Sequence, residues 1–245
     1  MLSFRLEGGL IVETYPLLLT LGVLLSFVWL ALTGPERSRG AQIDAGLAAL
    51  AGGLIGARAA FVLAHPAYYS THLVEAFWFW QGGLSWAGGA AGAFLGLALF
   101  SLLARRPLWP AADALAMPAA ILSLAAWTGC WAEGCAFGRR VAAGPFSPAS
   151  ADFFGGIAPR WPTQAAGVLL SLGAVALAYT LGAQKAPTGV AFGLTLSFLA
   201  AGSLALAFTR GDPGPSLAGL RADALGSAAV LLASAAITAA RLRAR

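Results

Sequence analysis

Charge is what this sequence has least of. Only 10% of its 245 residues are Asp, Glu, Lys or Arg, and 59% are hydrophobic. A soluble domain carries about 25% charged residues, so the composition excludes a soluble protein and predicts an integral membrane protein. The apolar runs are far longer than β-strands and lack an alternation of polar and apolar residues, which excludes a β-barrel. The predicted fold class is all-α, a polytopic membrane helical bundle.

Cysteine and histidine are scarce as well. The chain has two of each, Cys130 with Cys135 and His65 with His72. A zinc site needs more such ligands close together, so neither a metal nor another cofactor is predicted. Three interpretations of the cysteines stay open: a disulfide on an oxidising outer face, two small buried thiols, or a catalytic thiol. The histidines are either structural loop residues or take part in proton transfer.

Seven apolar segments are long enough to cross a bilayer, which takes about 20 residues. They cover 11–32, 43–64, 83–104, 110–128, 162–183, 188–209 and 220–240. Most connections are short, the exceptions being 65–82 and 129–161, and we expect a single membrane domain over 1–245. No small-residue cleavage site follows Leu32, so we expect the first segment to be retained. No histidine falls inside a span, which argues against an intramembrane serine protease, and the absence of paired broken helices argues against a transporter.

Basic residues in the connections favour an N-terminus outside and a C-terminus in the cytoplasm. The cytoplasmic segments would then hold Arg37, Arg39, Arg105, Arg106, Lys185, Arg241, Arg243 and Arg245, and the outer segments Arg5, Arg139, Arg140, Arg160, Arg210 and Arg221. The net charge of +5 then reflects membrane anchoring. Because the basic residues are scattered over short loops, no nucleic-acid partner is predicted.

In this orientation the unusual polar residues gather on the outer side. Arg58 lies near the outer end of the second span, where it either faces a watery cavity or snorkels to the interface. In a cavity its planar fork would suit a phosphate. The glycine-dense segment 81–89 lets the backbone come close to a ligand or to another helix.

Three further segments carry polar groups. In 127–140, three glycines and two cysteines are expected to break the helix into a compact loop. In 159–164, Arg160 and Gln164 either point into a cavity or mark the lipid interface. In 208–215, Arg210 and Asp212 either pair with each other or hold a polar headgroup.

Taken in order, six segments resemble the prolipoprotein diacylglyceryl transferase family. Residues 82–89 resemble its Gly-Gly-Leu-Ser-Phe-His-Gly-Gly, and residues 129–139 resemble its glycine-rich loop that ends in Tyr-Gly-Arg. The other four are Tyr15 ahead of the first long span, the Gly-Ala-Arg that ends at Arg58, the Pro-Thr-Gln that ends at Gln164, and the arginine segment 210–213. The resemblance runs along almost the whole chain.

The resemblance implies a fold and a function. The fold would have seven spans, the N-terminus outside, and a central cavity open to the outer face of a bacterial inner membrane. The function would be transfer of the diacylglyceryl group of phosphatidylglycerol to a cysteine thiol of a lipoprotein precursor, whose signal peptide would be a partner. Cations must stabilise the leaving phosphate, a base must assist the thiol, and an apolar cleft must hold the acyl chains.

The resemblance also implies site residues. Arg210, in the arginine segment, would be catalytic, and a transferase with shifted catalytic groups would use Glu133, His72 or Arg139, of which we take Glu133 and Arg139 as the candidates. The substrate-binding residues would be Tyr15, Arg58, Gly82, Gly83, Ser85, Gly88, Gly89, Gly138, Arg160, Gln164 and Asp212.

The sequence departs from the family pattern at several positions. Ala87 stands where the family has histidine, and Trp127 where it has the arginine of Gly-Arg-Ile-Gly. Cys130 replaces an asparagine, and residues 165–167 replace Leu-Tyr-Glu. Three interpretations follow: a transferase with shifted catalytic groups, a non-catalytic relative that binds phospholipid or an acylated partner, or an enzyme of related fold that acts on another lipid.

Overall fold

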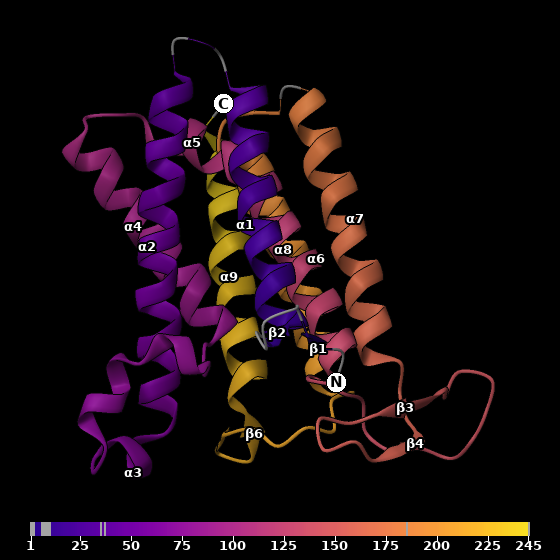
Figure 1. Cartoon of the computed structure of the whole chain (residues 1–245). Coiled ribbons are helices and arrows are strands. Elements are labelled where there is room, and N and C mark those ends of the chain that lie inside the picture. Colours follow the sequence, from indigo (N-terminus) through magenta and orange to yellow (C-terminus); the bar gives the residue numbers. More distant parts are fainter. Residues whose placement is uncertain (1–2, 6–10, 35, 37, 185, 245) are drawn as a thin grey trace.

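A computed structural model describes residues 3–5, 11–34, 36, 38–184 and 186–244 (Figure 1). Within these residues, seven helical segments are long and apolar enough to cross a membrane. They are α1 (Thr14–Thr33), α2 (Arg39–Ala64), α4 (Trp86–Leu103), α5 with α6 (Leu108–Ala114 and Ala116–Glu133), α7 (Thr163–Ala183), α8 (Val190–Ala207) and α9 (Ala222–Arg243). The predicted helical membrane bundle is therefore confirmed.

The fourth span differs most from the expected boundaries. It begins at Leu108, is interrupted at Leu115, and continues to Glu133. The interruption has a local cause: Pro118 has no N–H to donate to the carbonyl of Ala114. The helix break expected within 127–140 is present, but it lies later than the expected span end at 128: the helix continues through Gly129 and Cys130 and ends at Gly134, whose φ of +77° suits glycine.

Small residues bring α2 and α4 into close contact. A Cβ atom at Gly92 would overlap the carbonyl of Gly52, and one at Gly88 would overlap the carbonyl of Gly56. With no driving force from water between helices in lipid, such close backbone packing is a main source of helix association. Gly88, which belongs to segment 81–89, therefore has a role in helix packing.

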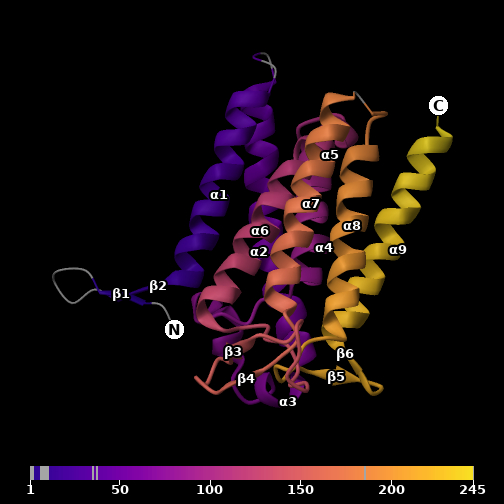
Figure 2. The same ribbon diagram turned by 90° about the vertical axis from the view of Figure 1, so that its right-hand side faces the viewer.

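The remaining helices pack α1 on α6, α6 on α7 and α8 on α9 (Figure 2). Buried hydroxyl groups tie some of them together: Ser123 meets Ser171 at 2.8 Å and Ser197 meets Ser234 at 2.8 Å. Each pair gives the serine hydroxyl groups a hydrogen-bond partner, which the lipid chains cannot supply.

The short elements α3 (Pro66–Tyr69), β3 (Ala149–Ala151), β4 (Ile157–Pro159) and β6 (Leu220–Arg221) gather at one end of the bundle, and the C-terminus lies at the other (Figures 1 and 2). The structure also has β1 (Ser3–Arg5), β2 (Ile11–Glu13) and β5 (Ser216–Leu217), which form antiparallel pairs β1–β2 and β5–β6. The two long connections and the segment before α9 therefore share one end. Among the basic residues used to predict orientation, Arg37, Lys185 and Arg245 lie outside the described residues.

Candidate functional site

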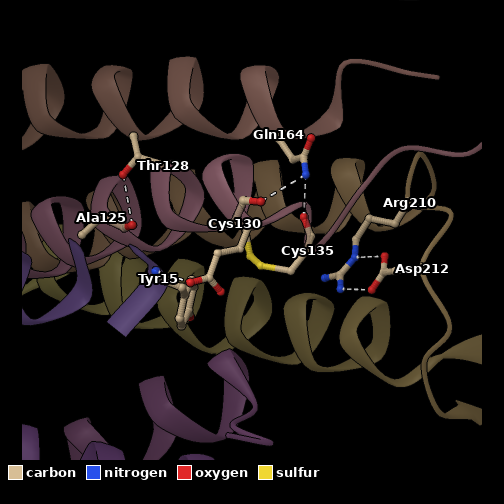
Figure 3. The surroundings of a disulfide bond; sticks show 9 residues. Tyr15, Ala125, Thr128, Cys130, Cys135, Gln164, Arg210 and Asp212 are labelled. Carbon is tan, nitrogen blue, oxygen red and sulfur yellow. Dashed lines mark hydrogen bonds and ion pairs between the residues drawn. A yellow bond between two sulfur atoms is a disulfide. The ribbon is translucent and has the colours of Figure 1, made fainter. Parts of the chain in front are cut away.

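The end of α6 is closed by a disulfide between Cys130 and Cys135 (Figure 3). Of the three interpretations of these cysteines, the disulfide is the one that the structure contains. Gln164, buried at the start of α7, donates from Nε2 to the carbonyls of Cys130 (3.2 Å) and Cys135 (2.7 Å). One amide thus satisfies carbonyls on both sides of the helix end, which fixes the loop against α7.

Glu133 lies between the two cysteines in sequence and faces the start of α1. Its Oε1 accepts the backbone N–H of Tyr15 at 2.6 Å. A carboxylate at a helix N-terminus satisfies a donor that has no partner within the helix. The ring of Tyr15 packs on Gly129, where a Cβ atom would lie 2.8 Å from the ring. This contact explains why glycine is needed inside α6.

Arg210 belongs to a network of four charged side chains. It donates from Nε to Asp212 at 2.8 Å and pairs with Asp223 at 3.1 Å. Arg221 pairs with the same two carboxylates, at 3.6 Å and 3.1 Å. Two cations and two anions make the network neutral. Burial alone would lower the pKa of Arg210, but the hydrogen bond and charge of Asp212 and the charge of Asp223 outweigh it, so its pKa lies above the usual value.

Backbone hydrogen bonds join this network to the loop after α6. The backbone N–H of Arg139 donates to the carbonyl of Thr209 (2.9 Å), and the N–H of Gly211 donates to the carbonyl of Phe137 (2.8 Å). On the other side, the N–H of Trp161 donates to the carbonyl of Arg139 at 3.1 Å. A side chain at Gly138 would overlap the carbonyl of Trp161, so only glycine fits between these strands.

The two arginines on this loop differ in their surroundings. Arg139 is exposed, and within the described part of the chain its side chain has no hydrogen bond or ion pair. Arg160 is 2% exposed, pairs with Asp152 at 2.7 Å, and lies 4.7 Å from the ring centroid of Phe137. Arg139 is therefore available to a ligand, whereas Arg160 holds the loop together.

Arg58 is buried and bound by the 65–83 connection. It donates to the carbonyls of Ala76 (2.9 Å), Gly82 (2.7 Å), Gly83 (3.3 Å) and Glu75. Four of its five N–H groups thus already have acceptors. Of the two sequence interpretations, a cavity-facing and a snorkelling arginine, the structure has the first, because Arg58 lines a cavity. The sequence did not predict the carbonyls that the folded connection brings to it.

The rest of the glycine-dense segment is built around the start of α4. Ser85 caps this helix by accepting the N–H of Gly88 at 3.4 Å, and its own N–H donates to the carbonyl of Ala57 at 3.0 Å. Gly89 leaves ordinary van der Waals room beside Ala57. These contacts give Ser85, Gly88 and Gly89 structural roles at the α2–α4 interface.

The predicted site residues therefore fall into two neighbourhoods at one end of the bundle. Around the end of α6 the structure brings together Tyr15, Glu133, Gly138, Arg139, Arg160, Gln164, Arg210 and Asp212. Around the α2–α4 pair it brings together Arg58, Gly82, Gly83, Ser85, Gly88 and Gly89. Figure 1 shows the α3 connection and the β3–β4 hairpin on opposite sides of that end.

Sequence reasoning missed Asp152 and Asp223, the anions that neutralise Arg160 and Arg210. A signal existed for Asp223, which follows Arg221 by two residues in an otherwise apolar segment. A carboxylate at the start of a membrane helix needs a partner.

Each neighbourhood has a cavity. The first, of about 500 Å³, lies between the end of α6 and the β3–β4 hairpin and includes Glu133, Asp152 and Gln164 in its wall. The second, of about 390 Å³, is lined by Arg58 and by aromatic side chains of the α3 connection.

Ala87 and Trp127, two of the residues that differ from the family pattern, each pack against a glycine. Ala87 lies against Gly226 of α9, where a Cβ atom would be 2.7 Å from that of Ala87. The indole of Trp127 fills the space beside Gly167 so closely that any side chain there would overlap it. The positions that resemble the family's arginine and glutamate are thus occupied by an aromatic ring and the glycine that accommodates it.

Comparison with known proteins identifies the family of this chain. A family model described as prolipoprotein diacylglyceryl transferase matches residues 2–240. The chain belongs to the prolipoprotein diacylglyceryl transferase family. The match covers six spanning segments in full, α9 as far as residue 240, and both neighbourhoods of predicted site residues.

Curated relatives in the family carry the name phosphatidylglycerol–prolipoprotein diacylglyceryl transferase. The chain is 39% identical to one from Thermus thermophilus over 74 residues, which are 30% of the chain and 26% of the relative. It is 35% identical to one from Bacillus velezensis over 128 residues, 51% of the chain and 46% of the relative. A relative from Verminephrobacter eiseniae is 35% identical over 137 residues, 54% of the chain and 48% of the relative. The chain thus spans about a quarter to a half of the length of these relatives.

Proposed function

We propose that this protein is a multi-pass transferase of the bacterial inner membrane that moves a diacylglyceryl group from phosphatidylglycerol to a cysteine thiol of a lipoprotein precursor. The observation that carries the proposal is the family match over residues 2–240. The names of the relatives support the choice of donor lipid and acceptor. No cofactor is needed, because the reaction is a substitution between two organic groups.

In the proposed reaction the acceptor sulfur attacks the glycerol carbon that bears the phosphate. A carbon–sulfur bond forms, the carbon–oxygen bond breaks, and phosphoglycerol leaves with the electron pair. Glu133 is the proposed base for the thiol proton, since a free thiol has a pKa of about 8.5. Its carboxylate lines the larger cavity and has the Tyr15 N–H as a partner.

Arg210 and Arg139 are the proposed cations for the leaving phosphate. Arg139 is supported by its exposure, and Arg210 by its place in the network that pairs with the Arg139 strand. A phosphate at Arg210 would have to compete with Asp212 and Asp223. Tyr15, Gln164, Gly138 and Asp212 are proposed to shape the binding site, and Arg160 to hold the adjoining loop in place through Asp152. Arg58 is proposed to hold the α3 connection beside the second cavity.

Transfer can be tested with purified protein, phosphatidylglycerol vesicles and a lipoprotein signal peptide with a free cysteine. We expect a thioether product that Arg210→Ala reduces by about 10²–10³-fold, the usual cost of a lost charge-stabilising donor. Arg243→Ala, at the opposite end of the bundle, should leave the rate unchanged. Absence of product from the unaltered protein would contradict the proposal.

A second function is favoured by one specific observation. Ala87 and Trp127 leave the positions of the family's histidine and arginine without a titratable or charged group, and Trp127 is packed against Gly167. A relative that binds phospholipid without turnover would have this arrangement. Phosphatidylglycerol bound in stoichiometric amounts without product would identify this second function. Turnover with a different acceptor would instead identify an enzyme that acts on another lipid substrate.

We also propose the orientation with the N-terminus outside and the C-terminus in the cytoplasm. This orientation puts the α3 connection, the β3–β4 hairpin and the Arg210 network on the outer face, where the acceptor cysteine would arrive. It is supported by the basic residues near the other end of the bundle, among them Arg105, Arg106, Arg241 and Arg243.

A further inference from the structure

The strand β3 has an open edge. Among the residues that the structure describes, it pairs only with β4, in the register Ala149 with Pro159 and Ala151 with Ile157. Two bonds flank this register: the N–H of Asp152 donates to Gly156 (3.0 Å), and that of Arg160 donates to Pro148 (3.3 Å).

These flanking bonds determine which backbone groups of β3 point outward. In an antiparallel ladder, hydrogen-bonded and non-hydrogen-bonded pairs alternate. Asp152 and Pro148 belong to bonded pairs, as does Ser150 between them. The N–H and C=O groups of Ala149 and Ala151 therefore point away from β4, towards the open edge.

The three residues of β3, Ala149, Ser150 and Ala151, line the cavity of about 500 Å³. Its remaining wall comes from the end of α6, the hairpin tip and Gln164. A strand edge that borders a cavity presents alternating donors and acceptors to whatever enters it. An extended polypeptide has the matching pattern, and strand addition is a common way in which proteins bind peptides.

The charge of the cavity argues against a phosphate. The ionisable side chains in its wall are the carboxylates of Glu133 and Asp152, and no Lys or Arg is among the described residues that line it. Asp152 is compensated by Arg160 at 2.7 Å, so Glu133 leaves the wall with a net negative charge. An anionic headgroup would be repelled there, while a neutral or basic peptide would not.

The rim supplies apolar contacts. Trp131, Phe153 and Phe154 lie around the cavity with 54%, 47% and 79% of their surfaces exposed. Exposed aromatic side chains beside an open strand fit the side chains of an extended, apolar segment.

We propose that this cavity is the docking site of the acceptor polypeptide, which binds in an extended conformation as a third strand on the open edge of β3. The proposal rests on the proposed transferase function and adds a place for its second substrate. The acceptor lies along Ala149 and Ala151 with its thiol near Glu133, and the phosphate of the lipid stays outside this acidic pocket.

The test uses a signal-peptide analogue in which the cysteine is replaced by serine, so that binding is measured without turnover. Single backbone N-methyl groups are placed at successive positions of the peptide, and affinity is measured with the full-length protein in nanodiscs. We expect N-methylation at alternate positions to weaken binding by about tenfold, since each removes one hydrogen bond. Methylation at the intervening positions should have little effect.

The matching protein variants are Ala151→Pro and Ala151→Val. Proline removes the outward N–H and is tolerated on edge strands, so binding should fall by about tenfold. Valine keeps the N–H and should bind as the unaltered protein does. Glu133→Gln should reduce the preference for a peptide with lysine over one with glutamate by about threefold.

Three results would overturn the proposal: no binding of the serine peptide, equal sensitivity at all N-methyl positions, or displacement of the peptide by phosphatidylglycerol headgroup alone. Failure of the transferase function is read separately, from the thioether assay with the cysteine peptide. If the serine peptide binds with the alternating pattern and the cysteine peptide yields no thioether, the docking site is supported and the proposed transferase activity is contradicted.

Discussion

At the scale of single residues, the most informative pair is Trp127 and Gly167. The two positions resemble an arginine and a glutamate of the family, and here they hold an indole ring and a glycine whose missing side chain leaves room for it. Any side chain at position 167 would overlap the ring. The pair is therefore one structural unit.

Filling that gap should be costly. Gly167→Ala forces the new methyl group into the indole of Trp127, and we expect a loss of about 1–3 kcal/mol in stability from overpacking. The loss of stability is measured as a lower melting temperature in thermal unfolding in detergent. Gly182→Ala, on the same helix with no atom within 4 Å of the added methyl, is the control and should be neutral or slightly stabilising.

The double variant Trp127→Leu with Gly167→Ala tests the coupling. Removing the indole should recover most of the loss from Gly167→Ala, and the non-additivity measures the contact. Simple addition of the two single effects would contradict the packing described above.

Gln164 offers a second prediction at this scale. Gln164→Leu leaves the carbonyls of Cys130 and Cys135 without their side-chain donor, so stability should fall by about 1–3 kcal/mol. Gln184→Leu is the control, because Gln184 is exposed at the other end of α7. An equal melting temperature for both variants would show that the amide is dispensable.

At the scale of elements, the α2–α4 pair depends on the absence of side chains. Gly92→Val places atoms against the backbone of Gly52 and Gly56, and should destabilise the protein by about 1–3 kcal/mol. Gly89→Ala on the same helix meets only ordinary contacts, 3.5 Å from Ala57, and should be tolerated. Equal thermal stability of the two variants would mean that the helices can separate at no cost.

The end of α6 depends on its covalent closure. A disulfide that closes so short a loop contributes about 2 kcal/mol, so the Cys130→Ser, Cys135→Ser double variant should melt earlier than the unaltered protein. Because the chain has no other cysteine, reductant should lower the melting temperature of the unaltered protein and leave the variant unchanged. A reductant effect of equal size on both proteins would argue against the bond.

The sequence predicted some elements well because their physics is local. A long apolar run has one solution in lipid, so the number and type of spans followed from composition, and the confirmed bundle is the result. The site was less predictable. The partners of Arg58 are carbonyls 17–25 residues away, and those of Arg210 include Asp223 at the start of α9. Contacts of this kind depend on how loops fold and leave no periodic trace in the sequence.

At the scale of the whole molecule, the proposed orientation is directly testable. A green fluorescent protein fused after the last residue should fluoresce, since the C-terminus is expected in the cytoplasm, and alkaline phosphatase at the same point should be inactive. The same reporters fused within the α3 connection should give the opposite pattern. The reverse result at both sites would invert the bundle and move the proposed site away from the acceptor.

The contacts of Arg58 have a consequence for the stability of the α3 connection. Its guanidinium is buried, and its acceptors are the carbonyls of Glu75, Ala76, Gly82 and Gly83, all in the connection between α2 and α4. Moving this connection away would leave a buried positive charge without acceptors, which costs more free energy than the loss of a neutral hydrogen bond. We therefore expect the α2–α4 hairpin and its connection to unfold together as one cooperative unit.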